Sequence, residues 1–216
     1  MSRVNFFNEN VKKYDAWFDR NGSAHASELE ALRDLLPVKG KGLEIGVGTG
    51  RFAAPLGVYL GIDPSIEMLK VAVERGIAVA MGVGENLPYK DASVDFALLV
   101  TTICFLDNVP GTLKEIYRVL RDGGYILIGF IDRKSFLGTT YETRKNDSVF
   151  YRDATFLSAD EIIAHLRQTG FRDFIFRQTI FKNSAEIKET ELVKPSFGEG
   201  SFVVVRGKKP FEQKGS

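Results

Sequence analysis

The 216-residue sequence has little cysteine, little histidine and almost no excess charge of either sign. Cys104 is the single cysteine, so no disulfide can form within the chain, and a reducing cytoplasm is the expected environment. His25 and His165 are far apart, so no cluster of metal ligands is expected and we predict no metal site. The sequence has 29 basic and 28 acidic residues, so the protein has no large overall positive charge that would favour binding of nucleic acid.

Long apolar runs are absent as well. None approaches the roughly 20 residues that a membrane-spanning helix needs, and residues 1–5 lack the charged-then-apolar order of a signal peptide. The length and the 44% hydrophobic fraction are typical of one globular domain with a single large core. We therefore expect one soluble cytoplasmic domain over residues 1–216, without a membrane span or a nucleic-acid partner.

The sequence does contain a glycine-rich stretch, Leu43 to Phe52, which reads LEIGVGTGRF. Its apolar start predicts a buried strand, with Glu44 near the end. Gly46, Gly48 and Gly50 then remove three side chains in succession, so the backbone can turn tightly and a ligand can lie against it. Open α/β sheets bind ligands at the carboxyl ends of parallel strands. We expect a nucleotide-like ligand here, the alternative being a plain strand-to-helix turn.

The glycine spacing distinguishes between ligands. A dinucleotide fingerprint, G-x-G-x-x-G, would put Arg51 where the third glycine belongs, which disfavours an NAD(P)-dependent oxidoreductase. The observed order, acid-x-Gly-x-Gly-x-Gly, instead resembles motif I of the class I S-adenosylmethionine (SAM) dependent methyltransferases.

A second acid, Asp63, follows the apolar run 58–62. An acid at the end of the second strand is placed to accept hydrogen bonds from ribose hydroxyls, although Asp-Pro-Ser is also common helix-entry chemistry. Ser65 is expected to cap a helix over 66–75. Met68, in the first turn of that helix, is suited either to the adenine face or to the core.

Three further segments resemble the same family. Tyr14-Asp-Ala-Trp-Phe18 is similar to the N-terminal segment of the ubiquinone/menaquinone-biosynthesis-type methyltransferases, which folds over the SAM site. Residues 82–88 resemble the family segment Gly-Asp-Ala-Glu-x-Leu-Pro, but Val83 stands where an aspartate usually receives the adenine amino group. Losing that hydrogen bond would cost about 1 kcal/mol. Residues 96–131 resemble the fourth strand, the next helix and the fifth strand.

The resemblance covers residues 10–207 and implies a SAM-dependent methyltransferase that acts on a small-molecule methyl acceptor. It implies an α/β, Rossmann-like fold with a doubly wound, mostly parallel sheet of seven strands in the order 3-2-1-4-5-7-6, the last antiparallel. The cofactor would be S-adenosyl-L-methionine, with S-adenosyl-L-homocysteine as product. The cofactor-binding residues carried over by position are Tyr14, Glu44, Gly46, Val47, Gly48, Gly50, Ile62, Asp63, Pro64, Met68, Val83, Gly84, Glu85 and Thr101.

The domain divides into four expected segments: a helical cap over 1–37, a cofactor-binding core over 38–131, a lid or substrate loop over 132–157, and a C-terminal helix with antiparallel strands over 158–207. In the cap, an apolar stripe over 5–21 predicts one helix, and the capping box at Ser27 predicts the start of a second that ends before Pro37.

Three more helices are expected in the rest of the chain. A short one would follow the glycine turn within 52–57, because only these residues separate it from the next apolar run. Asn108 should cap a helix over 109–121 that Gly123 and Gly124 end, and Ser158 opens a capping box for another.

No catalytic residue can be assigned. A general base is needed only if the acceptor must lose a proton, and His25 and His165 lie outside the motifs, where we expect structural roles. Two alternative functions remain. One is a non-catalytic SAM-binding protein, because Val83 departs from the family pattern. The other, less favoured, is an NAD(P)-dependent oxidoreductase.

Overall fold

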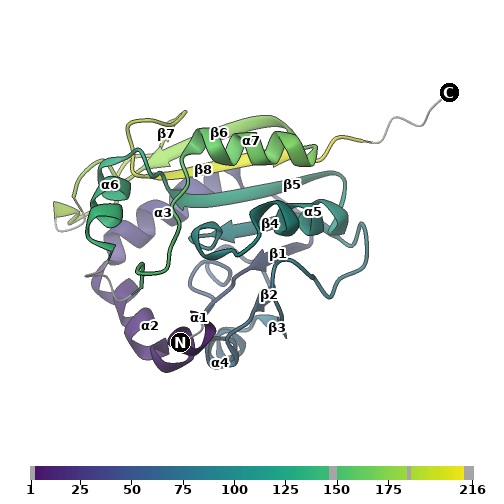
Figure 1. The fold of residues 1–216 in the computed structure, drawn as a ribbon, viewed down its shortest axis with the longest axis horizontal. Coiled ribbons are helices and arrows are strands. Elements are labelled where there is room, and N and C mark those ends of the chain that lie inside the picture. Colours follow the sequence, from purple (N-terminus) through teal and green to yellow (C-terminus); the bar gives the residue numbers. More distant parts are fainter. Residues whose placement is uncertain (1–2, 146–149, 184–185, 212–216) are drawn as a thin grey trace.

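Across the described residues, 3–145, 150–183 and 186–211, the computed structural model contains a sheet of eight strands in the order β3-β2-β1-β4-β5-β8-β6-β7 (Figure 1). The strands are β1 (Gly42–Ile45), β2 (Leu60–Asp63), β3 (Ala78–Met81), β4 (Val94–Val100), β5 (Leu120–Ile131), β6 (Arg172–Thr179), β7 (Lys194–Pro195) and β8 (Phe202–Lys208).

Strands β1 to β5 pair in parallel, whereas β8 runs antiparallel to both β5 and β6. The predicted doubly wound order is confirmed for the seven longer strands. The predicted number of strands is wrong, because Lys194 and Pro195 form an additional edge strand that pairs with Arg177 and Gln178. Two residues are too few to show the alternation that identifies a strand in a sequence.

Helices cover both faces of the sheet (Figure 1). They are α1 (Arg3–Glu9), α2 (Val11–Arg20), α3 (Gly22–Leu35), α4 (Ile66–Glu74), α5 (Val109–Val119), α6 (Phe136–Thr143) and α7 (Ala159–Thr169), with a 3₁₀ turn, η1 (Ile103–Phe105). Alternate strand residues supply the two cores: Leu98 packs with the α3 side, and its neighbour Leu99 with the α5 and α7 side. In the part of the chain that is described, no helix has the length and apolar character to cross a membrane.

Three predicted caps are confirmed because their signals are local. The Ser65 hydroxyl accepts a hydrogen bond from the backbone of Met68 at the start of α4, and the Asn108 side chain accepts one from Gly111 in α5. Ser158 and Glu161 form both halves of the predicted capping box of α7.

The N-terminal helices differ from the prediction. The stripe over 5–21 does not form one helix, because the chain leaves helical geometry at Asn10, whose side chain donates to the carbonyl of Phe6. The capping box at Ser27 is also wrong. Helix α3 begins at Gly22, and the Ser27 hydroxyl donates to the carbonyl of Ser23, a bond that serines make inside helices.

Three other boundaries differ as well. Residues 51–57 form turns rather than the expected short helix, and the expected lid segment contains α6. Helix α5 ends at Val119, and β5 begins immediately, so Gly123 and Gly124 lie within the strand rather than after the helix. Gly123 has φ +79° at the point where the pairing of β4 with β5 is irregular. The two glycines therefore allow an irregularity within the strand, although a glycine pair after a helix in a sequence usually indicates the end of that helix.

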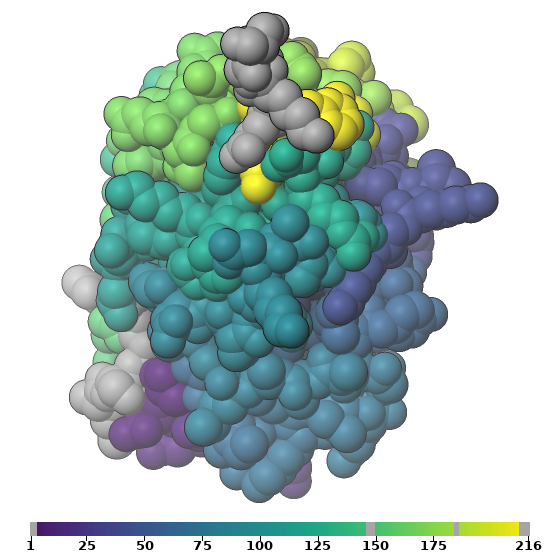
Figure 2. Space-filling model, turned by 90° about the vertical axis from the view of Figure 1, so that its right-hand side faces the viewer, coloured from purple at the N-terminus to yellow at the C-terminus, as the bar shows by residue number. Residues whose placement is uncertain are grey.

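The N-terminal helix lies against α4. Figure 2 shows the purple N-terminal residues beside the blue residues of that region, at the opposite end of this face from the yellow C-terminal strand. The contact is specific, because the Ser65 hydroxyl donates to Asn8 of α1 at 2.7 Å. The cap is thereby tied to the carboxyl end of β2, which holds Asp63.

Candidate functional site

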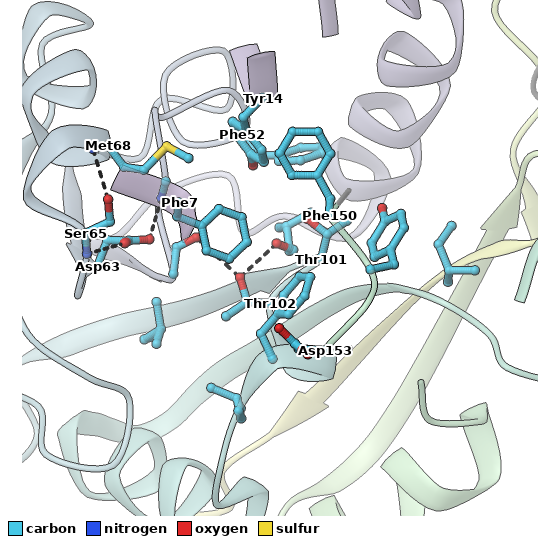
Figure 3. A pocket seen from close by; sticks show the side chains of 18 of the residues that line it. Phe7, Tyr14, Phe52, Asp63, Ser65, Met68, Thr101, Thr102, Phe150 and Asp153 are labelled. Carbon is cyan, nitrogen blue, oxygen red and sulfur yellow. Dashed lines mark hydrogen bonds between the residues drawn. The ribbon is translucent and has the colours of Figure 1, made fainter. Parts of the chain in front are cut away.

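A cavity of about 820 Å³ lies where β1, β2 and β4 end, beneath the N-terminal helices (Figure 3). Ten of the fourteen predicted site residues line it: Tyr14, Gly46, Gly48, Asp63, Pro64, Met68, Val83, Gly84, Glu85 and Thr101. Glu44, Val47, Gly50 and Ile62 are not among the lining residues. The structure therefore brings most of the predicted set together at one site.

The glycine turn disfavours side chains at two positions on the cavity wall. Gly46 has φ +73°, and a Cβ there would lie 2.3 Å from Cγ2 of Thr102. Gly48 has φ +52°, and a Cβ there would point at the Tyr14 hydroxyl, 3.4 Å away. A substitution would be strained at both positions, since other residues rarely adopt this backbone conformation.

Asp63 accepts hydrogen bonds from two backbone amides at the cavity edge. Its Oδ2 accepts from the N–H of Gly48 at 2.9 Å, and its Oδ1 accepts from the N–H of Ser65 at 2.8 Å (Figure 3). Burial raises the pKa of Asp63, whereas these two hydrogen bonds oppose the shift. The turn role expected for Asp63 is therefore present, and the side chain also lines the cavity.

Glu44 lies behind the glycine turn, 1% exposed. Burial raises the pKa of its carboxyl well above the ordinary value, although a hydrogen bond from the backbone of Ala53 acts the other way. Its Oε2 has no hydrogen-bond partner within the described ranges. An unpaired buried oxygen costs about 1–3 kcal/mol, so this atom is suited to a ligand with a hydrogen-bond donor.

The other three residues behind the wall shape the turn. The backbone amide of Val47 donates to the carbonyl of Ile62 at 3.0 Å, which joins the turn to β2. Gly50 allows close packing, because a Cβ there would lie 2.4 Å from Cδ1 of Ile77. These positions serve the backbone and the core rather than the cavity surface.

The remaining predicted residues line the two ends of the cavity. Met68 is 2% exposed, whereas Val83 is 46% exposed at the opening. The Glu85 carboxylate accepts from the backbone of Asn108 at 3.1 Å and so ties its loop to α5. Thr101 adopts φ +51°, a conformation that costs free energy and clusters at functional sites.

An aromatic cluster, made of Phe7, Tyr14, Phe105 and Phe150, lines the cavity. Figure 3 shows three of its members, Phe7, Tyr14 and Phe150. The ring of Phe7 meets those of Tyr14 and Phe105 edge-on at 6.2 and 5.6 Å, and Phe150 lies 5.9 Å from Tyr14. The rings come from the cap, from η1 and from the segment after α6. Residues far apart in sequence therefore meet at the cavity.

Asp15 holds α2 against the glycine turn, a role that the sequence did not reveal. Its carboxylate pairs with Arg51 and with Arg75, each at 2.6 Å, and accepts from the Thr49 hydroxyl at 2.8 Å. Burial would raise the pKa of Asp15, but the hydrogen bonds from Arg51, Arg75 and Thr49 outweigh it and lower the pKa. Because the partners lie 36 and 60 positions away, no local pattern indicates them.

Glu28 also lines the cavity, a position to which no sequence motif assigned a role. It is 5% exposed, and burial raises the pKa of its carboxyl to about 8. Tyr141 and Tyr151 line the same cavity and stack at 4.8 Å. His25, by contrast, does not line it: its Nε2 lies 3.0 Å from the carbonyl oxygen of Arg51, which fits the expected structural role.

Comparisons with known proteins agree with this arrangement. A family profile described as "Methyltransferase domain" matches residues 43–128. A crystal structure from Thermotoga maritima, described as a SAM-dependent methyltransferase and "possible histamine N-methyltransferase", is 50% identical and covers 95% of this chain and 99% of that one, with a TM-score of 0.93. An uncharacterized protein of Methanocaldococcus jannaschii is 48% identical over 95% of this chain and 100% of its own length.

The chain belongs to the class I SAM-dependent methyltransferases. The oxidoreductase alternative is therefore wrong, as is the non-catalytic one, since this methyltransferase is an enzyme. A phosphoethanolamine N-methyltransferase of Haemonchus contortus, solved with S-adenosylhomocysteine, shares the fold at 17% identity and a TM-score of 0.69, over 97% of this chain and 60% of that one.

The cofactor of the methyltransferase is S-adenosylmethionine. Its residues fit that molecule on two observations. The unpaired Oε2 of Glu44 behind the glycine turn offers an acceptor to the ammonium end, and the bare backbone at Gly48 leaves room beside Asp63 for a sugar.

Proposed function

We propose that this methyltransferase transfers the methyl group of SAM to a small-molecule acceptor held inside the cavity. The observation that carries the proposal is the size of that cavity, which the aromatic cluster and residues of the N-terminal helices line. Its volume of about 820 Å³ falls within the range of roughly 300–1,000 Å³ for small-ligand sites.

Each part of the site has a proposed role in holding the cofactor. Glu44 and Gly46 would face the methionine end, Asp63 would accept from the ribose hydroxyls, and Met68 and Val83 would flank the adenine. When bound, SAM supplies a methyl group on a positively charged sulfur. The face of Tyr14 near that charge would contribute about 0.5–2 kcal/mol by cation–π attraction.

The chain contributes mainly by positioning. Because the leaving sulfur becomes neutral, no oxyanion needs stabilising, and alignment of acceptor and methyl can supply roughly 7–11 kcal/mol. In this proposal residues 1–37 act as the cap and residues 132–157 contact the acceptor, since Tyr141 and Tyr151 line the cavity. We also propose a cytoplasmic location, on the single cysteine of the chain.

The name of the Thermotoga maritima relative supports amines as candidate acceptors, because that protein is 50% identical to this one. The test is incubation with methyl-labelled SAM and a panel of small amines, phenols, thiols and carboxylic acids. We expect label transfer to at least one small molecule. Transfer confined to protein or nucleic acid, with none to the panel, would overturn the proposal.

A further inference from the structure

One wall of the cavity has an acid that no motif explains. Ala24 and Glu28 are four residues apart on α3, so they share one helix face, and both line the cavity. Glu28 is 5% exposed, and no hydrogen bond or ion pair to its carboxylate is found among the residues the structure describes. A buried acid without a partner is expensive, so this carboxyl is available to a ligand in the cavity.

The surroundings of Glu28 combine apolar side chains with phenols. Tyr14, Tyr141 and Tyr151 line the cavity from three different segments, and burial raises the pKa of all three phenols, with the Glu28 charge adding to each shift. The three phenols and the Glu28 carboxyl therefore belong to the lining of one cavity. Apolar residues complete this part of the wall: Trp17, Phe18, Leu137, Ile180 and Ile187.

Among the residues that the structure describes, no cation pairs with this acid. Burial alone raises the pKa of Glu28 to about 8, with no contribution from a charged neighbour. His25 lies on the same helix, but it interacts with Arg51 and Arg33 instead. The other charged residues that line the cavity, Lys145, Arg152, Asp153, Asp107, Glu85 and Asp63, add nothing to the pKa of Glu28 either.

We propose that Glu28 binds the basic nitrogen of a small arylalkylamine and accepts its proton, which makes the enzyme an N-methyltransferase for amines of this class. The inference rests on the proposed function and names its acceptor. A carboxylate is the group that pairs with an ammonium ion, and the aromatic wall suits the apolar body of such a molecule.

The proton balance follows from the chemistry of amines. An alkylammonium ion has no free electron pair, so one N–H proton must first move to the Glu28 carboxylate. The freed pair on nitrogen then forms the N–C bond to the methyl group while the C–S bond breaks and its electrons remain on sulfur. The product nitrogen carries the positive charge, and the proton on Glu28 returns to solvent.

The test measures binding rather than turnover. Titration calorimetry on the protein saturated with S-adenosylhomocysteine would compare 2-phenylethylamine with 2-phenylethanol, which has the same body without a basic nitrogen. We expect the amine to bind at least tenfold more tightly at pH 8. The empty acid holds a proton below pH 8, so amine binding should release close to one proton at pH 7 and almost none at pH 9, as measured in buffers of different ionisation enthalpy.

The variant Glu28→Gln should bind the amine at least tenfold more weakly without proton release, while binding the alcohol as before. Glu30→Gln, on the exposed part of the same helix, is the matched control and should behave as wild type. Glu28→Asp keeps the acid and should retain proton release. Unchanged S-adenosylhomocysteine affinity shows that each variant is folded.

Equal affinity for amine and alcohol, or amine binding unaffected by Glu28→Gln, would overturn the assignment. The proposed function would stand in that case if phenols, thiols or acids of the panel were still methylated. It fails separately, if no small molecule is methylated at all.

Discussion

Asp63 has the turn role that the sequence offered as one alternative, and its ribose role stays a prediction. Its carboxylate positions the backbone amides of Gly48 and Ser65 at 2.9 and 2.8 Å, and it also lines the cavity where the ribose is proposed to bind. A single side chain therefore shapes the turn and offers acceptors to a ligand.

Replacing Asp63 with alanine should weaken S-adenosylhomocysteine binding at least tenfold. Hydrogen bonds to a charged group contribute about 1.5–3 kcal/mol, and tenfold corresponds to about 1.4 kcal/mol. Titration calorimetry gives the affinity, and circular dichroism checks folding. Affinity equal to that of wild type would leave Asp63 only its role in the turn.

Glu28 predicts a distinct dependence of stability on pH. Its pKa rises from 4.5 to about 8 on folding because of burial, so between these values the folded protein holds a proton that the unfolded chain has lost. Its contribution to stability is therefore present below pH 4.5 and declines by about 1.4 kcal/mol per pH unit up to pH 8.

Glu28→Gln should remove that decline. The melting temperature of the variant minus that of wild type should grow by roughly 3–5 °C per unit between pH 5 and 8. Differential scanning calorimetry over this range measures it. Parallel curves for the two proteins would show that the Glu28 carboxyl titrates normally.

The same residues show what a sequence can and cannot predict. The glycine turn and Asp63 were predicted as site residues because each has a local signal, and the structure brings most of the predicted set to one cavity. Glu28 received no role from the sequence, and the capping box expected at the serine before it is wrong. Tyr14, Tyr141 and Tyr151, which line the same cavity as Glu28, lie on other segments of the chain.

At the scale of elements, α2 is fixed to the glycine turn through Asp15. The helices α4, α5 and α7 were predictable because their caps are local, whereas the break between α1 and α2 depends on what each helix contacts. Two arginines pair with Asp15: Arg51 lies on the turn after β1, and Arg75 lies at the end of α4. Cap and cofactor turn therefore share one ionic cluster.

Asp15→Asn should loosen α2. The lost charge leaves Arg51 and Arg75 less well paired, and we expect a loss of about 1.5–3 kcal/mol in stability, with faster hydrogen exchange in α2 by mass spectrometry. Asp19→Asn is the matched control, because Asp19 also pairs with Arg51 but is 66% exposed, and exposed pairs contribute about 0–1 kcal/mol. Equal effects of the two variants would contradict the anchoring role.

At the scale of the whole molecule, the order of the strands could be predicted only through the family resemblance, since crossovers leave no local signal. The two-residue strand β7 escaped even that prediction. The two cores on either face of the sheet meet the expectation for a doubly wound fold, because alternate residues of β4 and β5 divide between them.

Binding of S-adenosylhomocysteine should stabilise the entire domain. At a concentration one hundred times the dissociation constant, a ligand adds about 2.7 kcal/mol, which corresponds to roughly 5–10 °C for a protein of this size. Thermal shift should show this rise with S-adenosylhomocysteine and none with NAD. A comparable rise with NAD would contradict the assignment of the glycine turn.

The aromatic cluster affects the relative rates of methyl transfer and product release. Its rings come from separate parts of the chain and contact one another in the cavity lining, so we expect them to slow the exit of a molecule of nucleoside size. S-adenosylhomocysteine should therefore dissociate more slowly than the methyl group is transferred. The first turnover should be faster than the turnovers that follow.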